Sequence, residues 1–131
     1  MNDCLFCKII NNEIPSSTVY EDDTIRIIMN INPNTNGHLL ILPKNHYVDV
    51  NDIPMEVVTH SLEVVKEKIF PLLKEKLNCE GLTIAENNGL GQEIKHFHLH
   101  LIPRYPNDHA DFKYDKENLK DVKEIYNKIM D

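Results

Sequence analysis

Short runs of apolar and β-forming residues predict β-strands in five segments of the chain, and within 94–102 apolar and polar positions alternate. Successive side chains of a strand point to opposite faces, so a period of two marks a segment with one buried face and one solvated face. Turn-forming residues separate the segments, for example Asn-Pro-Asn-Thr-Asn-Gly at 32–37. The predicted strands cover residues 18–20, 24–30, 38–42, 82–87 and 94–102.

A longer period predicts one amphipathic helix between the third and fourth strands. Asp52 is expected to cap its start, with Pro54 in the first turn. Pro71 is expected to kink or break it, because proline has no amide for the carbonyl of Glu67, and Gly81 to permit the reversal that follows. The apolar stripe consists of Val58, Leu62, Val65, Ile69 and Leu72.

A last helix is predicted near the end of the chain, capped by Asp115 and with an apolar stripe at Leu119, Val122, Tyr126 and Ile129. The elements together predict an α+β fold, in which a five-stranded antiparallel sheet is covered by one long helix and a C-terminal helix follows. A chain of 131 residues is expected to form one domain.

Composition limits the partners of the chain. It carries 21 acidic and 14 basic residues, a formal charge of −7, which argues against binding of polymeric nucleic acid through its phosphates. We expect no contact with a membrane and a cytoplasmic location, because no apolar run suits a signal peptide or a membrane span. Its three cysteines are therefore no disulfide framework, and Cys79 is expected to be a small buried residue.

Three histidines at two-residue spacing are the most informative part of the sequence. In a strand, His96, His98 and His100 share one face, and the apolar residues that alternate with them face the core. One metal ion cannot hold all three, because the outer two begin roughly 13 Å apart, whereas two zinc ligands lie within about 4 Å of each other. A single histidine of this kind is usually solvated or hydrogen-bonded, but chance explains a triplet poorly.

The segment Gly91-Gln92-Glu93-Ile94-Lys95-His96-Phe97-His98-Leu99-His100 resembles the signature of the histidine triad superfamily of nucleotide hydrolases and transferases. Three further stretches resemble the landmarks of that family in the same order. These are Cys4-Leu5-Phe6-Cys7, Glu13-Ile14-Pro15 and Gly37-His38-Leu39-Leu40-Ile41-Leu42-Pro43. The resemblance covers about residues 4–105 as the core of a single domain, with 106–131 as a C-terminal extension.

The resemblance implies that His98 is a nucleophile that forms a nucleotidyl-histidine intermediate. It implies further that His100, Asn87 and the backbone of Gly91, Gln92 and Glu93 hold the α-phosphate. Asn30 and Ile31 would lie at the ribose, and His38 next to the reaction centre. Many relatives carry Asp at the position of Asn30 and several carry Ser or Thr at that of Glu93, and the loop at 88–91 is shorter than theirs.

The Cys-x-x-Cys pair near the start of the chain suggests a metal site more than a redox motif, since no strand precedes it. With His46 and His96, Cys4 and Cys7 would complete a tetrahedral Cys₂His₂ zinc site of the structural kind. Spacing alone supports this weakly. Similar positions bind zinc in some relatives, so the resemblance implies structural zinc as a cofactor.

The expected function is hydrolysis or transfer at the α-phosphate of a purine nucleotide, such as a conjugate of AMP, by a phosphoramidase or a dinucleoside polyphosphate hydrolase. One alternative is a nucleotide-binding module with little turnover. Another is a metal-dependent hydrolase that uses two of the triad histidines and Glu86. The resemblance also implies a homodimer. We expect His60 and His109 to be solvated, and Arg104 either to steer an anion or to pair with an acid.

Overall fold

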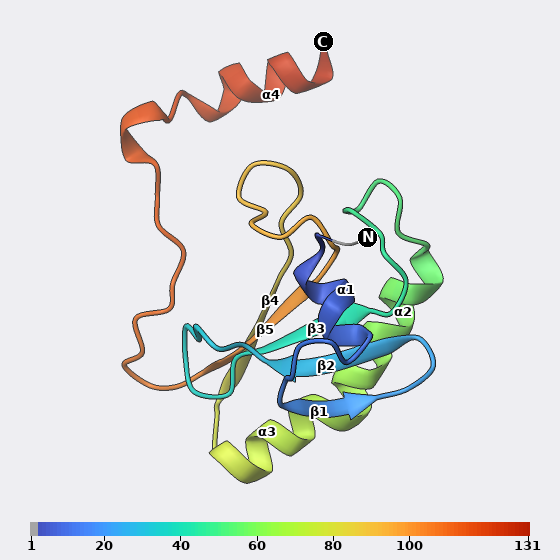
Figure 1. Ribbon diagram of the computed structural model, residues 1–131. Helices are drawn as coiled ribbons and strands as arrows, with labels where there is room; N and C mark the ends of the chain where they lie inside the picture. Colours follow the sequence, from blue (N-terminus) through green and yellow to red (C-terminus); the bar gives the residue numbers. More distant parts are fainter. Residues whose placement is uncertain (1–2) are drawn as a thin grey trace.

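Five antiparallel strands form the single sheet of the computed structural model, which describes residues 3–131 (Figure 1). Their order across the sheet is β1-β2-β3-β5-β4. The strands are β1 (Thr18–Glu21), β2 (Ile25–Met29), β3 (Leu39–Pro43), β4 (Gly81–Ala85) and β5 (Leu99–Arg104). All four neighbouring pairs are antiparallel, as predicted.

Helices cover both faces of the sheet. One long helical segment, made of α2 (Met55–Val64), a π-helical turn (Val65–Ile69) and α3 (Phe70–Leu77), packs on one face. The short helix α1 (Leu5–Ile10) packs on the other, where Phe6 and Ile9 contact Ile28 and Leu40. Because side chains alternate along a strand, β2, β3 and β5 each supply apolar residues to the core under the long helix and different residues to the face under α1.

The long helix does not break at Pro71. A π turn precedes it, in which the amide of Phe70 bonds to the carbonyl of Val65, and this places Pro71 in the first turn of α3, where an amide is not needed. The extra residue rotates the part of the stripe that follows it, so that Leu73 is buried in place of the predicted Leu72. Leu62 of the predicted stripe, which precedes the turn, is exposed as well. The buried positions are Ser61, Val64, Val65, Ile69 and Leu73.

Both predicted ends of this helix are wrong. Asp52 does not cap it, because its carboxylate accepts the amides of Val48 and Asp49 and so orders the preceding loop. The helix begins at Met55, and Asn78, in the left-handed conformation (φ 58°), ends it. Gly81 is instead the first residue of β4.

The strand that carries the triad is shorter than predicted. β5 begins at Leu99, so His96 and His98 lie in the irregular segment before it. In that segment the amide of Phe97 bonds to the carbonyl of Tyr47 rather than to a strand of the sheet. The predicted alternation nevertheless holds, because Phe97, Leu99 and Leu101 belong to the core under the long helix.

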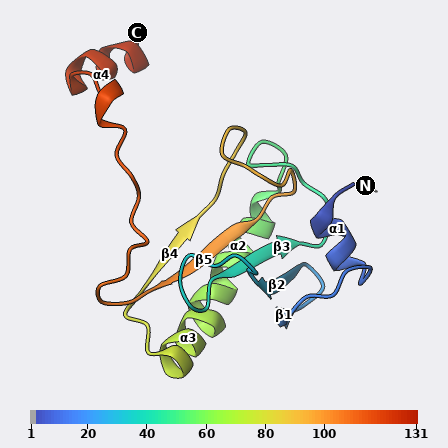
Figure 2. The ribbon, with the colours of Figure 1, turned by 60° about the vertical axis from the view of Figure 1, so that its left-hand side comes forward.

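The C-terminal extension leads away from the sheet (Figures 1 and 2). Asp115 precedes a 3₁₀ turn (Lys116–Asn118), and the final helix α4 (Val122–Met130) begins only after Asp121. The predicted helix is therefore confirmed, but not its cap, and α4 has no buried residue. Within residues 3–131, no helix combines the length and the apolar character that crossing a membrane requires.

Candidate functional site

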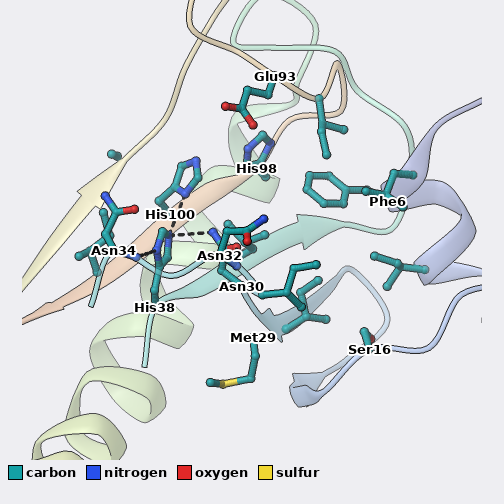
Figure 3. Close-up of a pocket in the computed structure, with 18 of the residues that line it drawn as sticks. Phe6, Ser16, Met29, Asn30, Asn32, Asn34, His38, Glu93, His98 and His100 are labelled. Atoms are coloured by element: carbon teal, nitrogen blue, oxygen red, sulfur yellow. Dashed lines mark hydrogen bonds between the residues drawn. The ribbon is translucent and has the colours of Figure 1, made fainter. Parts of the chain in front are cut away.

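A pocket of about 660 Å³ lies on the sheet face that α1 covers (Figure 3). Strands β2, β3 and β5 form its floor, and the loop before β5 forms one rim. Eight of the predicted site residues line it together, from five separate stretches of the chain. They are Asn30, Ile31, His38, Asn87, Gly91, Glu93, His98 and His100.

His98 presents a bare ring nitrogen. Its Nδ1 lies 2.8 Å from the carbonyl oxygen of His96, and because a carbonyl can only accept, Nδ1 carries the proton and Nε2 keeps its lone pair. The ring is 7% exposed and packs edge-on against Phe6, with 5.0 Å between centroids. Burial lowers the pKa of His98, while the His96 carbonyl and the charges of Glu86 and Glu93 oppose the shift. A neutral, correctly oriented imidazole results.

A chain of hydrogen bonds fixes the neighbouring imidazole, His100. The amide of Asn34 donates to Nδ1 of His38 (3.0 Å), so the proton of His38 lies on Nε2 and is donated to Nδ1 of His100 (2.9 Å). Nε2 of His100 therefore carries a proton and is a donor on the pocket side. Burial, followed by the charges of His98 and His38, lowers the pKa of His100 to about 4.

Asn30 and Ile31 lie at the opposite rim from the triad loop (Figure 3 labels Asn30). Oδ1 of Asn30 accepts the amide of Asn32 at 2.9 Å, which orients the side chain. Its Nδ2 lies 3.3 Å from Nε2 of His38, but both atoms carry protons, so the contact is not a good hydrogen bond. Ile31 is 91% exposed and offers an apolar surface to a ligand.

The glycine loop before the triad has a left-handed backbone at Gly89 (φ 74°) and Gly91 (φ 96°), which favours glycine at both positions. Gln92 holds the loop rather than lining the pocket. Its Nε2 donates to the carbonyl of Val48 (2.6 Å), its Oε1 accepts the amide of Gly89 (3.3 Å), and its own amide donates to the carbonyl of Gly89. Gly91 and Glu93, on either side of Gln92, line the pocket.

Cys4, Cys7, His46 and His96 come together at the end of α1 nearest the triad. Their candidate ligand atoms all lie within 4.8 Å of one another. Sγ of Cys7 lies 3.2 Å from Nδ1 of His46, and Nδ1 of His96 lies 3.4 Å from Sγ of Cys4 and 3.2 Å from Nδ1 of His46. Ligand atoms of a tetrahedral zinc ion lie about 3.3–3.8 Å apart, given bonds of about 2.3 Å to sulfur and about 2.0 Å to nitrogen.

The chemistry of the four donors also suits zinc. Nε2 of His96 bonds to the carbonyl of Pro43 at 2.9 Å, so its proton lies there and Nδ1 points bare into the cluster. Such a bond fixes the tautomer of many zinc-bound histidines. His96 is fully buried, and burial, offset in part by this bond, lowers its pKa to about 4. The four side chains therefore fit the predicted structural zinc.

The structure also assigns contacts to residues whose roles the sequence leaves open or does not reveal. Asn34 and Phe6 were missed, since nothing in their local pattern shows that one orients His38 and the other packs on His98. Arg104 pairs with Asp108 and Asp111, the second of its two predicted roles. His60 is not simply solvated, because its Nε2 lies 2.6 Å from Oδ2 of Asp22.

Comparisons with known proteins agree with this geometry. Residues 11–107 match the family model of the HIT domain. The chain is 39% identical over 128 residues to a HIT-like protein of Methanocaldococcus jannaschii (96% of this chain, 98% of that one). It is 37% identical over 103 residues to an adenosine 5'-monophosphoramidase of Saccharomyces cerevisiae (77% and 62%).

A solved structure shares the fold of most of the chain. A zinc-bound histidine triad family protein from Mycobacterium smegmatis superposes with a TM-score of 0.79 at 37% identity, over 87% of this chain and 84% of that one. Family model, relatives and fold therefore agree, and this chain belongs to the histidine triad (HIT) family.

Proposed function

We propose that the chain is a nucleotide-binding hydrolase or transferase that acts at the α-phosphorus of a purine nucleotide through a covalent intermediate on His98. The substrate would be a phosphoramidate or a dinucleoside polyphosphate. The observation that supports this most is the bare Nε2 of a neutral imidazole in a pocket of nucleotide size. The relative from Saccharomyces cerevisiae, an adenosine 5'-monophosphoramidase, supports the reaction class.

The proposed reaction has two displacements at phosphorus. The lone pair on Nε2 of His98 forms a bond to the α-phosphorus, and the bond to the leaving group breaks, with the leaving nitrogen or oxygen keeping that electron pair. A departing amine takes up a proton from solvent. Water then attacks the phosphorus and loses a proton to solvent, the Nε2–P bond breaks, and Nε2 regains its lone pair. Transfer replaces the water by another acceptor.

Donors for the α-phosphate surround the proposed nucleophile. Nε2–H of His100 is oriented before a ligand binds, which is how developing negative charge is best stabilised. The amides of Gly91 and Glu93, which line the same pocket, would be further donors. Asn87 lies beside them in the pocket lining. His38 would act through His100, because its proton is committed to that ring.

The nucleoside would occupy the apolar half of the pocket. Phe6, Ile28 and Leu40 line it there, and Asn30 and Ile31 would lie at the ribose. The side-chain amide of Asn30 offers the ribose hydroxyls a donor, because Oδ1 is engaged with the amide of Asn32.

Zinc would be held by Cys4, Cys7, His46 and His96 and would supply no reactive group, since all four positions are filled by protein. Those residues would pin α1 beside the triad loop and so fix where Phe6 and His98 lie. We also propose that the protein acts in the reducing cytoplasm as a homodimer. A reducing compartment suits two cysteines held as zinc ligands.

The two alternative functions, a metal-dependent hydrolase and a binding module without turnover, make different demands on the histidine triad. A catalytic metal would need ligands converging in the pocket, but within residues 3–131 the group of metal-ligating side chains that converges is the cysteine and histidine cluster. Oε1 of Glu86 is instead held by Asn88 at 2.6 Å. A binding module without turnover would bind AMP in calorimetry yet leave every substrate intact.

The test compares turnover of an adenosine phosphoramidate and a diadenosine polyphosphate, with acid-free quenching and mass spectrometry of the protein. We expect an adenylyl adduct on the unaltered protein, and loss of both adduct and turnover in His98→Ala. His60→Ala, remote from the pocket, is the matched control and should keep both. Undiminished turnover in His98→Ala would end the covalent proposal.

A further inference from the structure

Glu93 places a negative charge at the mouth of the pocket. Its carboxylate lies beside the ring of His98, on the rim formed by the triad loop (Figure 3). Of the pocket-lining residues between 3 and 131, Glu93 is the one acid, and the histidines beside it are neutral.

No lysine or arginine among residues 3–131 lines the pocket. Lys95 is near in sequence, but its ammonium donates to the carbonyls of Gln92 (3.0 Å) and Gly89 (3.2 Å) and so serves the loop. Glu86 adds a second negative charge that acts on His98. The formal charge of the whole chain, −7, has the same sign.

This distribution of charge separates possible leaving groups. The single negative charge of an α-phosphate can be met by Nε2–H of His100 and the amides of the loop. A polyphosphate leaving group brings several more negative charges to a rim that already carries Glu93. A leaving amine that carries a second nitrogen as an ammonium group would instead be attracted to the carboxylate of Glu93.

We propose that Glu93 selects the leaving group by charge, so that adenylyl phosphoramidates of amines with a second, cationic nitrogen are the preferred substrates and substrates with anionic leaving groups are disfavoured. The proposal rests on the proposed function and deepens it. Glu93 acts through its charge alone and takes no part in the making or breaking of bonds. It is therefore a specificity-determining residue rather than the nucleophile.

The experiment uses three AMP phosphoramidates with the same P–N bond and different charge, formed with 1,3-diaminopropane, propylamine and β-alanine. Unaltered protein should show the highest kcat/KM for the cationic compound and the lowest for the anionic one. In Glu93→Gln, the ratio of kcat/KM for the cationic compound to kcat/KM for the anionic compound should fall roughly tenfold. This is the size expected for unit charges a few ångströms apart at a partly solvated site. Glu93→Lys should reverse the order.

The control is Glu63→Gln, which removes the same charge from the exposed side of α2 and should leave the ratio unchanged. Added salt should compress the ratio in the unaltered protein and hardly affect it in Glu93→Gln. A ratio that is the same in unaltered protein and Glu93→Gln would overturn the proposal.

Failure of the proposed function would look different. If no phosphoramidate is turned over, binding of the same three compounds to His98→Ala measures the charge preference without catalysis. A ratio of dissociation constants that responds to Glu93→Gln would then support charge selection alone, and a ratio that does not respond would reject it.

Discussion

Two imidazoles of the triad reach fixed tautomers through their hydrogen-bond partners. For His98 the partner is the carbonyl of His96, and for His100 it is His38, itself oriented by the amide of Asn34. The alternation of the sequence predicts that these rings share a face. It cannot predict the tautomers, because the partners of His100 lie about sixty residues away in the chain and meet it only in the folded sheet.

The hydrogen bond from His38 to His100 gives a prediction for a single residue. His38→Phe removes the donor to Nδ1 of His100, so that either ring nitrogen can carry the proton. Losing one hydrogen bond of about 1 kcal/mol corresponds to about fivefold in rate. We expect kcat/KM to fall by at least this factor while the adduct still forms on His98. Unchanged kcat/KM would show that the orientation of His100 does not matter.

Elements are positioned by contacts that the local pattern does not reveal. The period of the long helix was predicted correctly, but the π turn before Pro71 shifted its buried stripe, because the alternative was a carbonyl with no partner amide. Likewise α1 appears in the sequence as little more than a Cys-x-x-Cys spacing. Its place beside the triad depends on His46 and His96, which are remote in sequence.

The cluster of Cys4, Cys7, His46 and His96 gives a prediction for α1. Cys7→Ser should reduce bound zinc and lower the melting temperature by about 8 °C, taking about 2 kcal/mol for the lost site and about 4 °C per kcal/mol. Metal analysis and thermal denaturation measure both, with Cys79→Ser, outside the cluster, as a control for metal content. The assignment would be refuted if the purified, unaltered protein contained no zinc and gained no stability when zinc was added.

The contact between α2 and the β1–β2 turn gives a pH dependence. Burial would raise the pKa of Asp22, but hydrogen bonds from His60, the amides of Ile25 and Thr24, and Tyr20 outweigh it and hold the pKa well below the usual value of 3.8. A depressed pKa in the folded state contributes stability that is present above the unfolded pKa and lost as pH falls below it.

Asp22→Asn should therefore cost about 1 kcal/mol or more of unfolding free energy at pH 7, and somewhat less at pH 3, where the carboxyl group is largely protonated in the unfolded chain but not in the folded one. Urea denaturation of both proteins at the two pH values measures the difference. An equal loss of unfolding free energy at both pH values would mean that the charge of Asp22 contributes nothing to stability.

At the scale of the whole molecule, the buried core of residues 3–131 lies in the sheet, its two helical layers and the loops between them. The two apolar clusters extend no further than Tyr105, whereas α4 and the 3₁₀ turn before it have no buried residue. The fold class could be predicted from strand and helix periods, which are local. The path of the extension could not, because its exposed apolar residues make few contacts with the sheet that would fix a direction.

Removal of residues 116–131 should consequently change the melting temperature of the monomer by less than about 2 °C, since no buried apolar surface is lost. Thermal denaturation at low protein concentration measures this. A large loss of stability would show that α4 contributes to the core in solution.

The proposed reaction depends most on Nε2 of His98 being the atom that bonds to phosphorus. NMR of protein labelled with ¹⁵N-histidine, trapped during turnover of an adenosine phosphoramidate, tests this directly through ¹⁵N–³¹P coupling. We predict one coupled signal, at Nε2 of His98, with Nδ1 still protonated toward the carbonyl of His96. Coupling at Nδ1 or at another histidine, or hydrolysis that proceeds with no coupled signal under single-turnover trapping, would contradict it.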